Sequence, residues 1–189
     1  MKTSNTKTLL LCAAMIVVAV FLRISNVELG IFNLVPLAAI SLFAGAIFQN
    51  RAMAMTIPLL ALLLSDTYME YRDGTGFYGL SQSFVYGGML LVAILGSYMK
   101  NFKPLSVLGY TISGSLLFWI VSNFGVFLEG WNGISFAGLI QTYMMAIPFL
   151  DNNMATQLFI NSFVSDIIMS GVLFGAYALI SKKSLAIAK

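Results

Sequence analysis

A carboxylate inside the last apolar run is the residue best suited to chemistry. Asp166 follows Met154 in that run and would lie about 18 Å along a helix starting there, at about 1.5 Å per residue. That depth is near the middle of a bilayer, where a charged side chain costs about 2.5–3.5 kcal/mol on insertion scales. Asp166 must therefore face other helices or a wet cavity. Its polar neighbours at helical spacing are Asn161, Ser162, Ser165 and Ser170. This polar stripe predicts either a site for a ligand, ion or proton, or a hydrogen-bonded contact between helices.

A second carboxylate closes an earlier apolar run. Asp66 follows the sequence LLLS, and residues 66–82 continue as a charged, Gly-rich and Tyr-rich stretch. We therefore expect the third helix to end at Asp66, at the outer membrane surface. There its side chain either orients a ligand or simply ends the helix in water.

Residues 122–166 are rich in amide, acidic and aromatic side chains. Asn123, near the expected outer end of the fifth helix, bonds either a neighbouring helix or a ligand. Trp131 and Tyr143 either stack on a flat ligand ring or anchor the chain at the membrane interface. Apolar spacings of three and four over residues 135–149 predict a helix that either lies at this interface or dips into the membrane, and that ends at Pro148.

The residue types exclude several chemistries. His is absent, which removes the commonest metal ligand and the usual general base near neutral pH. The single cysteine, Cys12, lies in the first apolar run. No phosphate-binding, nucleophile-elbow, dinucleotide-binding or zinc motif is present. We therefore predict no catalytic residues, no metal and no cofactor.

The elements that position these residues are membrane helices. The 189 residues are 59% hydrophobic and only 9% charged, with a mean hydropathy of +0.91. A soluble domain has about 25% charged residues. We expect one all-α domain, residues 1–189, with six transmembrane helices in one compact bundle. Asn33 and Pro36 should break the second helix near its outer end. The expected spans are residues 8–22, 30–48, 52–65, 83–99, 105–128 and 154–180, of which the first and third are short.

Charge placement predicts the orientation. With six spans, eight of the ten Lys and Arg residues fall on the side that holds both termini, and no Asp or Glu does. The positive-inside rule then makes both termini cytoplasmic and turns the larger loops, residues 66–82 and 129–153, outward. The basic charge follows from this topology and predicts contact with the lipid bilayer, not with nucleic acid.

Four strings carry a family resemblance: NLVPLAAISLFAGAIF, PLLALLLSD, SNFGVF and YMMAIPF, at residues 33–48, 58–66, 122–127 and 143–149. They resemble an uncharacterised bacterial six-helix membrane family that is associated with the S components of energy-coupling-factor vitamin transporters. S components are membrane subunits that capture a vitamin or related micronutrient from outside the cell. They dock on a transmembrane coupling subunit with two ATPases.

The resemblance implies a function and a ligand site. The protein would bind and take up a small, ring-containing, vitamin-like compound across the bacterial cytoplasmic (inner) membrane. Many S components dock through an Ala-x-x-x-Ala pattern in the first helix, but Ala13 and Ala14 are followed here by Val17 and Val18. Docking on an ATPase module and solitary action both stay open. The substrate-binding residues implied are Asn33, Asp66, Tyr68, Asn123, Trp131, Tyr143, Asn161 and Asp166.

Two other classes of function remain. One is a non-transport assembly subunit of a cell-envelope complex, which would hold a protein partner and no ligand. The glycine pair of GVLFG, Gly171 and Gly175, permits close helix contact, either with such a partner or within the bundle. The other is an intramembrane enzyme, which the lack of His and of a nucleophile–base pair disfavours.

Overall fold

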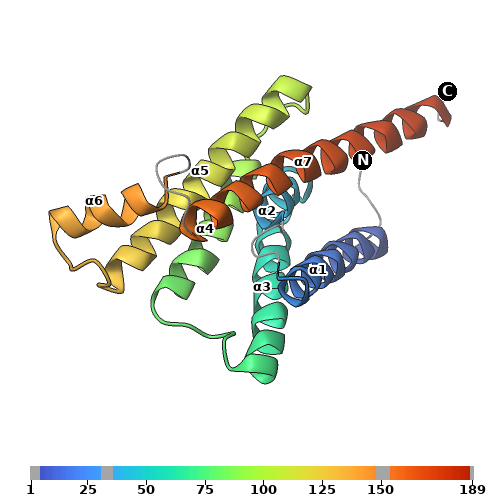
Figure 1. The fold of residues 1–189 in the computed structure, drawn as a ribbon. Coiled ribbons are helices and arrows are strands. Elements are labelled where there is room, and N and C mark those ends of the chain that lie inside the picture. The colour runs from blue at the N-terminus through green and yellow to red at the C-terminus, as the bar shows by residue number, and fades with distance from the viewer. Residues whose placement is uncertain (1–4, 31–35, 148–153, 188–189) are drawn as a thin grey trace.

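The computed structural model describes residues 5–30, 36–147 and 154–187, and these contain helices and no strand. Asn50 caps the third helix by accepting hydrogen bonds from the N–H groups of Ala52 and Met53, and Gly74 ends it with φ at 67°. The helices, shown in Figure 1, are α1 (Asn5–Glu28), α2 (Leu37–Ile47), α3 (Arg51–Asp73), α4 (Ser81–Gly96), α5 (Pro104–Leu128), α6 (Phe136–Met145) and α7 (Met154–Ile187).

Four helices are long and apolar enough to cross a membrane. They are Leu9–Glu28 within α1, all of α3, all of α5, and Ile160–Leu179 within α7. The chain is therefore an all-helical protein suited to a lipid bilayer. Two further apolar helices, α2 and α4, are shorter. The 11 residues of α2 extend only about 16 Å, roughly half of a bilayer core. The count of six spans remains a prediction.

The expected lengths of the helices are wrong for the first three. The sequence predicts short first and third helices, whereas α1 and α3 have 24 and 23 residues. The second and fourth helices are the short ones. Asp66 does not end the third helix at the membrane surface, because α3 continues for seven residues to Asp73. Asp66 is paired with Arg23 of α1, which offsets the cost of its charge, so α3 can continue past it.

The short helix α2 lies at the centre of the fold and packs against α1, α3, α4, α5 and α7. All residues from Leu37 to Gly45 are buried. Glycines allow α2 and α4 to cross closely: a Cβ at Gly45 would lie 1.8 Å from the carbonyl oxygen of Ala93. At Gly96 it would lie 2.2 Å from the carbonyl oxygen of Leu42. The two backbones are therefore in direct contact.

The two ends of the helix bundle differ in the charged residues that they hold. At one end, Arg72 of α3 forms an ion pair with Glu28 of α1, and Glu129 after α5 accepts a hydrogen bond from the N–H of Ser81. At the other end, Arg51 of α3 lines a cavity of about 10 Å³ between α2, α3 and α4. This cavity is about the size of one water molecule. Acidic loops and basic turns therefore lie at opposite ends.

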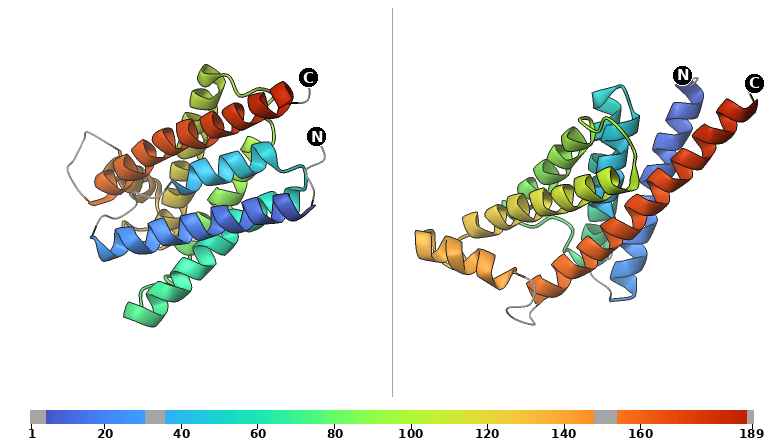
Figure 2. Two further views of the ribbon diagram at one scale, coloured as in Figure 1. Left: turned by 90° about the vertical axis from the view of Figure 1, so that its right-hand side faces the viewer. Right: turned by 90° about the horizontal axis from the view of Figure 1, so that it is seen from above.

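The remaining helices extend outward. Figures 1 and 2 show α6 beside α5, with the C-terminal part of α7 projecting away from α6. A Cβ at Gly171 or Gly175 would meet nothing within 4 Å. Both glycines are exposed, so this pair makes no close helix contact within the described part of the chain.

Candidate functional site

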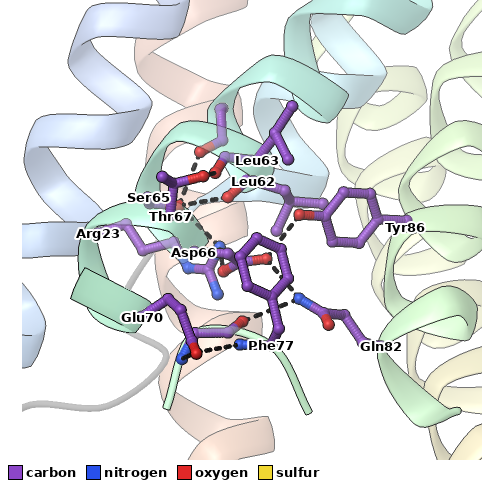
Figure 3. A network of polar contacts seen from close by, with 12 residues as sticks. Arg23, Leu62, Leu63, Ser65, Asp66, Thr67, Glu70, Phe77, Gln82 and Tyr86 are labelled. Atoms are coloured by element: carbon purple, nitrogen blue, oxygen red, sulfur yellow. Dashed lines mark hydrogen bonds and ion pairs between the residues drawn. The ribbon is translucent and has the colours of Figure 1, made fainter. Parts of the chain in front are cut away.

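A buried group of polar side chains joins α1, α3 and α4. The Asp66 carboxylate is 1% exposed, and its Oδ1 lies 2.6 Å from Arg23 Nη1. Its other oxygen, Oδ2, accepts hydrogen bonds from Gln82 Nε2 at 2.9 Å and from the Tyr86 hydroxyl at 2.7 Å. Figure 3 shows Arg23 of α1 and Gln82 and Tyr86 of α4 pointing toward Asp66 of α3. We call Arg23, Asp66, Gln82 and Tyr86 the Asp66 cluster.

The two oxygens of Asp66 are held differently. Oδ2 has two hydrogen-bond donors, whereas Oδ1 accepts no hydrogen bond of good geometry from the described residues and is held by the charge of Arg23. Arg23 Nη1 also donates to Ser65 Oγ at 2.8 Å. One side of the carboxylate therefore depends on a single charged partner that is itself shared with another acceptor.

The loop of residues 74–80 packs directly against this cluster. Glu70 Oε2 accepts hydrogen bonds from the N–H groups of Gly76 and Phe77 at 3.0 and 3.1 Å. Gln82 Nε2 donates to the Gly76 carbonyl at 3.0 Å as well as to Asp66. A Cβ at Gly76 would lie 1.8 Å from the Asp66 carbonyl oxygen, so only glycine allows this approach. The 74–80 loop therefore covers the cluster through contacts with α3 and α4.

The pKa of the Tyr78 hydroxyl is affected by its burial and by the charges of Arg23 and Asp66. Burial raises the pKa of its hydroxyl above the usual 10.0, the positive charge of Arg23 opposes this rise, and the negative charge of Asp66 adds to it. Its backbone N–H donates to Gln82 Oε1 at 3.2 Å. Tyr78 is 43% exposed and therefore connects the cluster to the molecular surface.

Asp166 lies in a different, fully enclosed place. Its side chain is 0% exposed. Oδ1 accepts a hydrogen bond from the N–H of Ala39 at 2.9 Å, and Oδ2 accepts one from Ser115 Oγ at 2.9 Å. Ala39 is in the first turn of α2, where N–H groups have no partner within the helix, and Pro36 provides no side-chain cap. Asp166 of α7 therefore caps α2 and links it to α5.

The other candidates in the second half of the chain do not join either carboxylate. Asn123 Nδ2 donates to the carbonyl of Trp119, one turn back in α5, at 2.8 Å. Tyr143 donates to the Ile120 carbonyl at 2.6 Å, and its ring packs edge-on against Trp119 with centroids 5.4 Å apart. Trp131 is 83% exposed. The two contacts of Tyr143 hold α6 against α5.

Three candidates remain to be placed. The Tyr68 hydroxyl donates to Glu28 Oε1 at 3.1 Å, on the exposed side of α3. Asn161 is half-buried on α7, within one and a half turns of Asp166. Asn33 lies outside the described residues. The sequence grouped all eight candidates at one site, whereas the structure distributes the described ones over several contacts.

Sequence reasoning missed the partners of both carboxylates. The sequence predicts that Arg23 closes the first helix and that Gln82 belongs to the 66–82 loop, because charged and amide side chains next to apolar runs usually face water. The stretch from Arg23 to Leu29 nevertheless contains no Gly or Pro. The absence of these helix-ending residues is compatible with a longer first helix. Tyr86 and Ser115 lie in apolar runs and carry no local signal of a polar contact.

The helices and the buried ion pair together define a polytopic helical membrane protein with a polar cluster inside its bundle. The chain belongs to a family of unknown function, DUF6580, whose model matches residues 3–187. No curated protein and no solved structure matches the chain significantly.

Proposed function

We propose that this protein is a solute-binding uptake protein of the bacterial cytoplasmic membrane, similar to the S components of energy-coupling-factor transporters. Its ligand is a small, ring-containing, vitamin-like micronutrient. The observation that carries the proposal is the Arg23–Asp66 ion pair, which lies inside two helices long enough to cross the membrane. Ionisable residues within membrane helices are costly and usually mark a binding site or pathway.

The surroundings of the ion pair fit ligand capture. The cluster lies under a short loop that is fastened by a few hydrogen bonds, so a limited movement of the 74–80 loop opens it. The loop residues Phe77 and Tyr78 supply aromatic rings that suit a flat ligand. The proposed orientation places this end outside the cell and both termini in the cytoplasm, which agrees with Arg51, Lys100 and Lys103 at the opposite end.

A direct test is native mass spectrometry of the protein extracted in a mild detergent. The expected result is a co-purifying small molecule that is retained by the wild type. The double variant Arg23→Gln, Asp66→Asn should lose it, because both charges are removed while each position keeps a polar amide side chain. Arg72→Gln is the matched control, since it breaks an ion pair on the exposed surface of the same end. Absence of any bound compound, or equal retention in the double variant, would refute the proposed site.

Docking is a separate part of the proposal. An S-component-like protein either docks on a transmembrane coupling subunit with ATPases or acts alone. Co-purification of an ATPase with the tagged protein from its native membrane would support docking, and uptake of the identified ligand by the protein alone in liposomes would support solitary action.

A second function is favoured by one observation. Gly171 and Gly175 present backbone on the exposed surface of α7, where lipid-facing helices usually carry large apolar residues. Such a surface suits the packing of another helix and therefore a non-transport assembly subunit of the cell envelope. The variant Gly171→Leu, Gly175→Leu should then lose a stable protein partner while the fold is retained. A protein that has no partner in mild detergent would exclude this role.

A further inference from the structure

The Asp66 cluster has a charge balance that restricts what can bind there. Arg23 and Asp66 contribute one positive and one negative charge, and their side chains are only 16% and 1% exposed. Glu70 is the other acidic residue of this network, but it is exposed to solvent and accepts two backbone hydrogen bonds from the 74–80 loop. The buried part of the cluster therefore has no net charge.

A ligand that enters the cluster must preserve this balance. If a ligand separates Arg23 from Asp66, each buried charge loses its partner unless the ligand replaces it. A purely anionic ligand would satisfy Arg23 and leave Asp66 unpaired, and a purely cationic ligand would do the opposite. Leaving one buried charge without a partner is strongly unfavourable.

The geometry shows where such a ligand would insert. Oδ1 of Asp66 is held by Arg23 alone, at 2.6 Å, while Oδ2 keeps Gln82 and Tyr86. A ligand ammonium can therefore replace Arg23 at Oδ1 without disturbing the donors at Oδ2. The released guanidinium has several N–H groups and can bind a carboxylate in a bidentate manner.

We propose that the ligand of the Asp66 cluster is a zwitterion, whose carboxylate binds Arg23 and whose ammonium group binds Asp66 at Oδ1. This inference rests on the proposed function, since it assigns a chemical class to the captured solute. The aromatic residues of the 74–80 loop then cover the ring or side chain of the ligand. Without a ligand, Arg23 and Asp66 pair with each other, so the site has no net charge.

Thermal unfolding of the purified protein tests this assignment with simple probes. The common L-amino acids are added singly at millimolar concentration, and at least one should raise the unfolding temperature in a concentration-dependent manner. The N-acetyl derivative of that amino acid keeps only the carboxylate, and its amide keeps only the ammonium group. Each should bind about 30-fold more weakly or worse, because one buried charge stays unpaired.

Variants identify the site. The double variant Arg23→Gln, Asp66→Asn should fold but lose the response to the amino acid, whereas Arg72→Gln should keep it. If the double variant does not fold, the comparison of the amino acid with its two derivatives still decides the charge requirement in the wild type. The zwitterion assignment is overturned if no amino acid stabilises the protein, if a singly charged derivative binds equally well, or if the folded double variant keeps its response.

Failure of this assignment is distinct from failure of the proposed function. A co-purified compound that is not zwitterionic, and that the double variant loses, would overturn the ligand class and leave the uptake function standing. A protein with no co-purified compound and no response to any amino acid would overturn both.

Discussion

The capping role of Asp166 can be tested by two substitutions that differ in hydrogen bonding. Asp166→Ala removes the acceptors for the Ala39 N–H and the Ser115 hydroxyl. Asp166→Asn keeps an oxygen for Ala39 and provides an N–H group for Ser115. If Asp166 acts as a cap, the alanine variant should be destabilised and the asparagine variant should stay close to the wild type.

The expected loss comes mainly from one backbone group. The Ala39 N–H is buried and has no carbonyl within reach in its own helix, and a buried donor without a partner costs about 1–3 kcal/mol. The Ser115 hydroxyl can turn to a carbonyl of α5 and should cost little. Adding the lost packing, we expect a decrease of about 2–4 kcal/mol in the free energy of unfolding for Asp166→Ala. Asp166→Asn should lose about 1 kcal/mol or less.

The cost of placing a carboxylate in lipid does not reverse this expectation. Unfolding of a membrane protein in micelles leaves the helices in an apolar phase, so the insertion cost of Asp166 is present in both states. It cancels in the free energy of unfolding. The hydrogen bonds, which exist in the folded state only, do not cancel.

The assay is reversible unfolding by sodium dodecyl sulfate in mixed micelles, followed by the fluorescence of the two tryptophans. Asp73→Ala is the control, because its side chain is 38% exposed and pairs with the neighbouring Arg72. Exposed pairs are worth about 0–1 kcal/mol. An alanine variant at position 166 as stable as the wild type would refute the capping role. An asparagine variant as unstable as alanine would show that charge, and not hydrogen bonding, is what α2 requires.

Three further predictions use the same preparation. Gly45→Ala should strongly destabilise the protein, since its Cβ would lie 1.8 Å from the Ala93 carbonyl oxygen, whereas Gly109→Ala, with nothing within 4 Å, should not. Gly76→Ala should lift the 74–80 loop from α3 and speed hydrogen exchange there, and unchanged exchange would show that the loop does not need this close approach. Tyr78 should titrate above pH 10, because burial raises its pKa. The stability that the protonated Tyr78 hydroxyl contributes is complete below pH 10. It is lost as pH rises through the higher pKa that this hydroxyl has in the folded protein. The phenolate absorbance of Tyr78 is the difference between the wild type and Tyr78→Phe, and it should therefore appear above pH 10. A difference that titrates at the ordinary tyrosine pKa of 10.0 would contradict the burial of this hydroxyl.

The sequence was sufficient for the class of fold and for placing Asp166 within the last helix. Composition alone predicts membrane helices, and the uninterrupted run after Met154 correctly places Asp166 inside α7. Its partner Ala39 is 127 residues away in sequence, and no local pattern encodes such a contact. The choice between a ligand site and a contact between helices therefore needed the structure.

The Asp66 cluster shows a different kind of failure. The sequence predicts that Arg23 and Asp66 end their helices, because an isolated charge within an apolar run is costly in lipid. The two residues offset each other, and the pair allows α1 and α3 to continue beyond them. A pairwise compensation of this kind is invisible when each apolar run is read alone.

The dependence of α2 on α7 has a consequence for how the chain matures. The ribosome delivers the second helix long before the last one, so the Ala39 N–H lacks its Asp166 acceptor until the last helix is made. The nascent protein therefore passes through an intermediate in which this contact between its central helix and its last helix is not yet formed. Completion of the core is thereby tied to the end of synthesis, and a product truncated before the last helix should be recognised by quality-control proteases.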